Sequence, residues 1–75
     1  MNKVRREQLG IAYGRLKDCA EDLALIRSDE EDALDNIPEN LQGTEKAERM
    51  EEAISSIDDA IECIEEAIQY LDEVV

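Results

Sequence analysis

The C-terminal half of the chain carries an apolar pattern that leaves little choice of fold. Between residues 47 and 75, apolar residues recur at alternating steps of three and four without interruption. They are Ala47, Met50, Ile54, Ile57, Ile61, Ile64, Ile68, Leu71 and Val75. Because such steps place side chains on one face of an α-helix, this segment predicts a long amphipathic helix over about residues 45–74.

Three consecutive heptads within this helix, residues 52–58, 59–65 and 66–72, are near-copies of one another. Each heptad adds an alanine beside its two larger apolar residues, at Ala53, Ala60 and Ala67. Three apolar positions in seven are typical of a helix in a bundle, whereas a two-stranded zipper needs only two. The pattern therefore predicts packing against more than one neighbouring helix.

The N-terminal half predicts a second helix over about residues 2–35. Its main apolar row alternates steps of three and four, with one charged member. The row is Leu9, Ala12, Leu16, Cys19, Leu23, Ile26, Glu30 and Ala33, with Tyr13, Ala20 and Leu34 along one flank. Gly10 and Gly14 each weaken this helix by about 1 kcal/mol relative to alanine. We expect the row to face the second helix.

Residues 36–44 predict the turn between the two helices. Pro38 disfavours helix at the preceding residue, and residues 38–41 are expected to form one helical turn. Gly43 is expected to allow the chain reversal, and Thr44 is a suitable N-cap for the second helix. We expect Ile37 and Leu41 to close the end of the apolar row.

The predicted fold is therefore all-α: an antiparallel two-helix hairpin, coiled-coil-like, forming one domain over residues 1–75. If the chain folds back near residue 40, the numbers of residues at the same level sum to about 80. Arg15 and Lys17 would then lie level with residues 62–66, and Glu30 level with Met50. Because so small a hairpin has little core, we expect it to dimerise into a four-helix bundle.

Charge restricts the partners that such a hairpin can bind. The net charge is −13, divided into +4 over residues 1–17 and −17 over residues 18–75. A surface of this sign repels nucleic acid and anionic membranes, so we expect neither as a direct partner and expect basic proteins instead. Basic residues at the N-terminus precede no apolar run, so no signal peptide or membrane span is predicted and the expected location is the cytoplasm.

Paired carboxylates recur every seven residues along the second helix and form its acidic face. They are Glu51, Glu52, Asp58, Asp59, Glu65, Glu66, Asp72 and Glu73. With the other acids of this helix, they place one charge per roughly 4 Å, close to the 3.4 Å phosphate spacing of a DNA strand. Two interpretations stay open: a solvated exterior that keeps the protein soluble, and a nucleic-acid mimic that occupies a basic groove.

Several apolar residues lie beside the two apolar rows and are more than one hairpin can cover. The candidates for self-association are Ile11, Tyr13, Leu25, Leu34 and Tyr70. Exposed apolar patches usually mark association. A homodimer is the preferred interpretation, with docking of a different protein and scattered surface residues as alternatives.

The sequence supplies no catalytic, metal-binding or cofactor-binding group that we can identify. Without histidine, Cys19 and Cys63 have no neighbouring base and are expected to be buried or half-buried free thiols, although a disulfide between them is conceivable. The acidic run at residues 29–32 with Asp35 lacks the spacing of a calcium loop. We therefore predict a protein that is not an enzyme and has no metal or cofactor.

The segment from Ala33 to Thr44, followed by Glu-Lys-Ala-Glu-Arg-Met-Glu-Glu-Ala-Ile, resembles a segment of small uncharacterised proteins from Gram-positive bacteria and their phages and mobile elements. The likeness covers roughly residues 28–72. It implies a phage-type accessory protein, a class that includes inhibitors of host or defence machinery. The resulting hypothesis is a self-associating acidic hairpin that binds a basic host or defence protein, with a purely structural oligomerisation module as the alternative.

Overall fold

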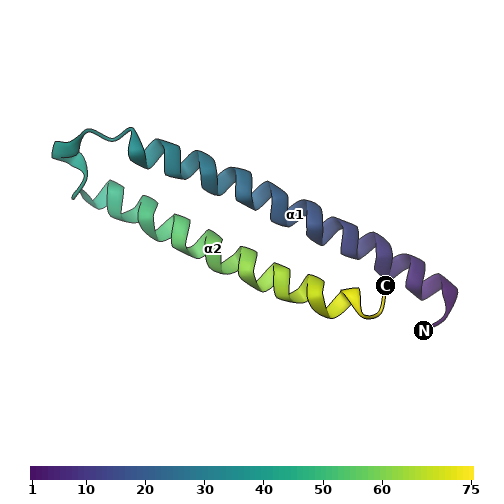
Figure 1. The fold of residues 1–75 in the computed structure, drawn as a ribbon. Helices are drawn as coiled ribbons and strands as arrows, with labels where there is room; N and C mark the ends of the chain where they lie inside the picture. The colour runs from purple at the N-terminus through teal and green to yellow at the C-terminus, as the bar shows by residue number, and fades with distance from the viewer.

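Two long helices lying side by side make up nearly the whole molecule (Figure 1). The computed structural model describes all 75 residues. Helix α1 runs from Lys3 to Asp35, a short 3-10 turn η1 from Glu39 to Leu41, and helix α2 from Glu45 to Asp72. The chain reverses at η1, so the helices are antiparallel and both termini lie at the opposite end. This is the all-α hairpin that the sequence predicts, and the prediction is confirmed.

Both helices begin with a side-chain cap. The side chain of Asn2 accepts a hydrogen bond of 2.8 Å from the backbone N–H of Arg5. At the start of α2, the Thr44 hydroxyl accepts from the N–H of Ala47 and donates to the carbonyl of Leu41 at 2.8 Å. An N-cap of this type contributes about 1 kcal/mol. The predicted role of Thr44 is confirmed.

The turn differs from expectation in two respects. No residue has a positive φ, so the reversal does not use the conformational freedom of Gly43, and that assignment was wrong. Instead the side-chain amide of Gln42 donates to the carbonyls of Ile37 at 2.7 Å and of Leu34 at 3.4 Å, and the second bond ties the loop to the end of α1. Ile37 is half-buried, but Leu41 is exposed and does not close the apolar row.

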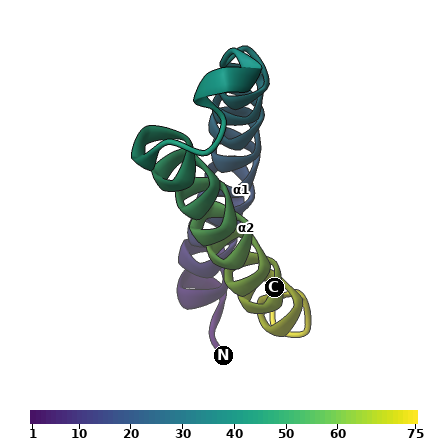
Figure 2. The ribbon, with the colours of Figure 1, turned by 90° about the vertical axis from the view of Figure 1, so that its left-hand side faces the viewer.

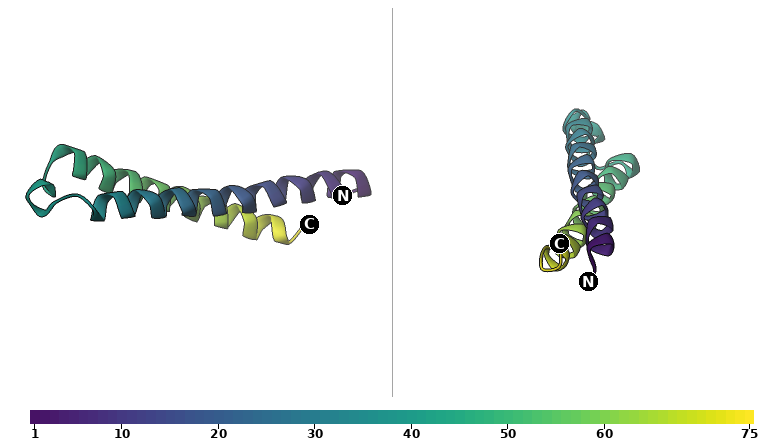
Figure 3. Two further views of the ribbon diagram at one scale, coloured as in Figure 1. Left: turned by 90° about the horizontal axis from the view of Figure 1, so that it is seen from above. Right: turned by 90° about the vertical axis from the view of Figure 1, so that its right-hand side faces the viewer.

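The apolar row of α2 faces α1, as predicted, but α1 covers it only in part. Half-buried residues follow the predicted steps of three and four: Met50, Ile54, Ile57, Ile61, Ile64, Ile68 and Leu71. Only Ala47 is completely buried. Figures 2 and 3 show two reasons for this partial burial. The axes of the two helices cross at an angle, and no third element lies over them. The hairpin therefore has a seam and no enclosed core.

Helix α1 turns a different flank toward α2 from the one that the sequence suggested. Leu9, Leu16 and Leu23 are half-buried, as expected. The second half-buried row, however, is Tyr13, Ala20, Arg27 and Leu34, whereas Ala12, Cys19, Ile26 and Ala33 are exposed. The expectation for these last four residues was wrong. Two side-chain contacts to α2, described below, hold α1 in this rotation.

These two contacts can be compared with the sequence prediction that residues of α1 and α2 at the same height along the hairpin have numbers that sum to about 80. Arg27 contacts Asp58, and Tyr13 contacts Asp72, so that both pairs of residue numbers sum to 85 instead of about 80. Side chains in a helix point back toward its N-terminus. In antiparallel helices, long side chains from the two partners therefore lean toward each other and join residues that start from different levels. The excess over 80 agrees with this geometry.

The seam predicts unequal responses to substitutions on its two sides. Ile61→Asp places a charge in the half-buried row, which should lower the free energy of unfolding by about 2–4 kcal/mol and remove most of the helicity. Glu66→Gln, at an exposed position of the same helix, should change stability by less than about 0.5 kcal/mol. Circular dichroism during thermal unfolding measures both. Equal losses for the two variants would mean that the seam is misplaced.

Candidate interaction surfaces

The acidic face of α2 lies at the surface of the hairpin. All eight of its carboxylates are exposed. Asp58 and Asp72 bond to side chains of α1, and the other six form no hydrogen bond or ion pair within the hairpin. At 1.5 Å per residue, the pairs repeat about every 10 Å along the rod. The face is therefore a regular array of carboxylates on a rigid support, six of which are free.

One flank of the hairpin is closed by polar contacts, and we call it the bonded flank. The guanidinium of Arg27 reaches Asp58 through Nε at 2.7 Å and through Nη2 at 3.3 Å, and it also contacts Glu31 on its own helix. The hydroxyl of Tyr13 donates to Asp72. The hydrogen bond to Asp58 raises the pKa of Arg27.

A cation lies over the tyrosine at the other end of the bonded flank. The Lys17 Nζ is 4.7 Å from the centre of the Tyr13 ring, within the range of a cation–π contact. Contact with Tyr13, helped by the charges of Asp72 and Glu21, raises the pKa of Lys17. Polar groups therefore follow the bonded flank from the termini to its middle.

The opposite flank has no such contacts, and we call it the open flank. Residues three positions after a row and residues four positions after it lie on opposite sides of that row. Arg27 follows Leu23 by four, so the exposed residues that follow the three leucines and Glu30, the next member of their row, by three lie on the other side. They are Ala12, Cys19, Ile26 and Ala33. On α2 the corresponding row is Ala53, Ala60 and Ala67.

The open flank is apolar over most of its length. Ile26 is 53% exposed, and Ala60 is exposed as well. Cys63 and Tyr70 follow Ala60 and Ala67 by three positions and lie at its edge, with Tyr70 76% exposed. No acid or base interrupts the two rows between Ala12 and Ala33 or between Ala53 and Ala67. This flank is therefore an apolar surface that the hairpin leaves partly uncovered, with Ala53 and Ala67 half-buried.

The residues that the sequence singled out for self-association divide into two groups. Tyr13 and Leu34 are half-buried in the rows toward α2, and Tyr13 belongs to the bonded flank. Ile11 and Leu25 are exposed on α1, about 100° round the helix from Ala12 and Ile26. Tyr70 lies at the edge of the open flank. The structure thus does not bring these five residues together in one patch.

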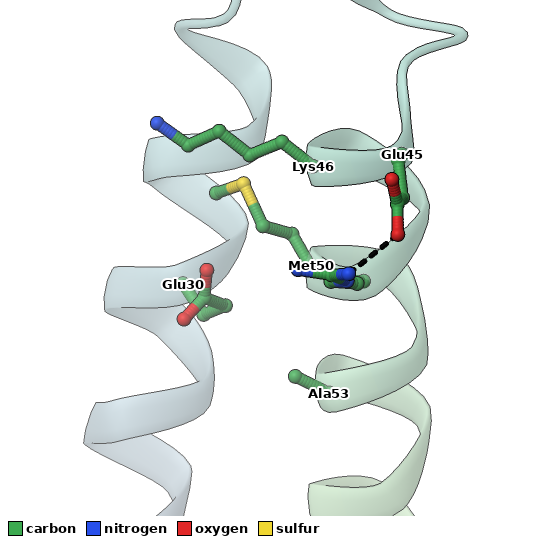
Figure 4. A pocket seen from close by; sticks show the side chains of 6 residues that line it. Glu30, Glu45, Lys46, Met50 and Ala53 are labelled. Atoms are coloured by element: carbon green, nitrogen blue, oxygen red, sulfur yellow. Dashed lines mark hydrogen bonds and ion pairs between the residues drawn. The ribbon is translucent and has the colours of Figure 1, made fainter.

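At the turn end, the open flank becomes a shallow charged hollow (Figure 4). It is lined by Glu30, Glu45, Lys46, Arg49, Met50 and Ala53. Figure 4 shows the side chains of Met50 and Lys46 reaching from α2 toward α1, where Glu30 faces them. Arg49 bonds to Glu45 on its own helix and not to Glu30. Glu30 thus lies near Met50, as the sequence suggested, without an ion pair to either base.

The basic N-terminal segment, residues 1–17, forms no ion pair with the acidic part of α2. None of its five basic residues pairs with a carboxylate, and the hairpin's three ion pairs involve only Arg27 and Arg49. Figure 1 shows that the start of α1 extends past the end of α2. The first basic residues therefore have no part of α2 beside them.

Both cysteines are free and exposed. The expectation that they would be at least half-buried was wrong, because α1 turns Cys19 onto the open flank and Cys63 lies at the edge of that flank. No group of three or more acidic or sulfur side chains is arranged to hold a metal ion. Neither helix is long and apolar enough to cross a membrane.

Sequence reasoning missed which flank of α1 would close, although a signal was present. Tyr13 and Arg27 are fourteen residues apart, and so are Asp58 and Asp72. In antiparallel helices, two equal spacings allow both pairs to form in one register.

Comparison of the chain with protein-family models, curated proteins and solved structures finds no match.

The bonded flank predicts a small but measurable coupling between α1 and α2. Arg27 and Asp58 are both partly exposed, so a double-mutant cycle of Arg27→Gln and Asp58→Asn should give a coupling energy of about 0.3–1 kcal/mol in urea unfolding. Arg49→Gln with Glu45→Gln is the control, since that pair lies within α2 and joins no two elements. A coupling of zero for Arg27 and Asp58 would mean that this contact does not hold the helices together.

Proposed function

We propose that this chain is a non-enzymatic protein-interaction module: a self-associating hairpin whose acidic face binds a basic surface of another protein. The observation that carries the proposal is the division of the molecule into unlike surfaces. One long side presents free carboxylates at regular intervals, and the open flank presents apolar residues that a single hairpin leaves uncovered. Six of the eight carboxylates of the acidic face take no part in contacts within the hairpin, so they are available to a partner.

The acidic face suits a partner that normally holds nucleic acid. Rigid spacing matters here, because carboxylates fixed on a helix lose less entropy on binding than those of a disordered acidic tail. A basic groove that accepts phosphates at about 3.4 Å per strand residue would meet carboxylates at comparable density. The resemblance to phage and mobile-element proteins adds a biological setting, namely inhibition of a host or defence protein.

A second function is favoured by the open flank alone. If the chain binds only through its apolar surface, it is a structural oligomerisation module, and its carboxylates serve only to keep it soluble. The two functions can be separated by neutralising the acidic face. This change should abolish binding of a basic protein if the chain is an interaction module, and it should leave association unchanged if the chain is only an oligomerisation module.

The acidic-face proposal predicts salt-sensitive capture of a basic protein. Immobilised hairpin should retain such a protein from a Gram-positive bacterial lysate at about 50 mM salt and release it by about 500 mM, because screening weakens exposed charge pairs. A variant with Glu52→Gln, Glu66→Gln and Glu73→Gln should retain about tenfold less. Quantitative mass spectrometry measures both.

The matched control removes three acids from elsewhere on the surface, through Asp18→Asn, Glu21→Gln and Glu39→Gln. All three residues are exposed and unpaired. This variant has the same net charge as the acidic-face variant, so it should still capture the partner. Capture that is unaffected by salt, or lost equally in both variants, would contradict binding through the acidic face.

A further inference from the structure

We propose that the open flank is covered by a second copy of this chain, packed so that the turn end of one hairpin lies beside the termini of the other. This inference rests on the self-association in the proposed function, and it adds which surface associates and in which direction. In this arrangement, α1 packs on α1 of the second copy, antiparallel to it.

The size of the open flank fits a second copy. The molecule measures 60 × 15 × 13 Å, so the whole long side that contains the open flank and its polar edges has an outline on the order of 900 Å². A standard protein interface buries roughly 800 Å² on each partner. The bonded flank cannot serve in its place, because Arg27, Lys17 and two carboxylates lie along it and would have to be desolvated.

Packing across the open flank would also complete the seam. The isoleucines of α2 are half-buried in the hairpin, and the alanines beside them allow another helix to approach closely. If the two-fold axis crosses α1 at Cys19, its middle residue, then Ala12 lies opposite Ile26 of the second copy, and Ile26 opposite Ala12. A small residue facing a large one lets two identical helices interdigitate.

Charge along the hairpin determines the direction. Residues 28–52, which form the turn end, carry ten acidic and two basic side chains, a net charge of −8. The opposite end, residues 1–17 and 63–75, carries five of each and is neutral. Two hairpins with their turn ends together would place −8 beside −8. The antiparallel arrangement places each acidic end beside a neutral end whose bases are unpaired.

Individual charges beside the open flank match in the same arrangement. Arg15, Asp22 and Asp29 follow Ala12, Cys19 and Ile26 by three positions and therefore lie beside them, on the side away from α2. With Cys19 on the axis, Arg15 lies level with Asp22 of the second copy. Arg5, in the row of Ala12 and Cys19, lies level with Ala33 of that copy, one helical turn from Asp29, a distance that the long arginine side chain can span. None of these four residues is paired within the hairpin.

The charge order of α1 is otherwise unexplained. Its first turn is basic and its last turn acidic, which is the reverse of what the helix dipole favours. Each such charge costs a few tenths of a kcal/mol in an isolated helix. In two antiparallel α1 helices, the basic start of one lies beside the acidic end of the other, and the same order becomes attractive.

The first test asks whether the open flank is the interface. Light scattering of the unchanged protein should give twice the 8.5 kDa mass of the chain. Ile26→Lys should raise the dissociation constant at least tenfold although it reduces the net negative charge. Ala24→Lys, at an exposed position of the same helix off the open flank, is the control and should leave association unchanged. Circular dichroism verifies that both variants remain helical, and Ala60→Lys repeats the test from α2.

The second test determines whether the two hairpins pack in the antiparallel direction, by exchanging charges between two variants. One variant carries Arg5→Glu and Arg15→Glu, and the other carries Asp22→Lys and Asp29→Lys. Each alone brings like charges together and should raise the dissociation constant about three- to tenfold at low salt. An equimolar mixture should recover the original association, because in the mixed dimer every exchanged charge meets an opposite one.

The outcomes separate the two proposals. A strictly monomeric protein at all concentrations would overturn both self-association and this inference. A dimer that Ile26→Lys and Ala60→Lys leave intact would keep self-association and overturn the open flank as its interface. A dimer that these variants disrupt, but whose charge-swapped forms do not recover on mixing, would overturn the antiparallel direction.

Discussion

The contact between two rows of aliphatic side chains is the constraint on which the rest of this molecule depends. A row of isoleucines on α2 meets the leucines of α1, and each buried aliphatic side chain can contribute about 1.5–3 kcal/mol only when it is fully removed from water. Here the row is half-buried and a single alanine is completely enclosed. A chain of 75 residues with so little enclosed volume has a small margin of stability. A further layer of apolar side chains would add to that margin.

Polar contacts then decide how the two helices are rotated. The pairs of Arg27 with Asp58 and of Tyr13 with Asp72 are worth little individually, because they are exposed. Their effect is to select one flank of α1 for contact with α2. By closing that flank they leave the other one, with Cys19 and Ile26, free of charge and of contacts. On α2, these contacts use only two of the eight carboxylates of the acidic face, so the other six remain free.

Most of the fold could be predicted from the sequence because its signals are local and repeated. Unbroken steps of three and four fixed both helices, and Pro38 and Thr44 marked the turn and the second helix start. The rotation of α1 could not be predicted as easily, since Ala12 and Tyr13 are equally plausible neighbours of the leucine row. Distinguishing them required contacts between residues 31 and 59 positions apart. For the same reason, the sequence placed Tyr13 and Leu34 with Ile11 and Leu25, whereas the structure separates them.

The half-covered seam implies that folding and association are linked, and thermal unfolding at several protein concentrations tests this directly. If a second hairpin completes the seam, the midpoint measured by circular dichroism should rise by about 5–10 °C over a hundredfold increase in concentration, because association stabilises the folded chain by mass action. A midpoint that stays constant over that range would show that one hairpin is sufficient by itself, and would contradict this account.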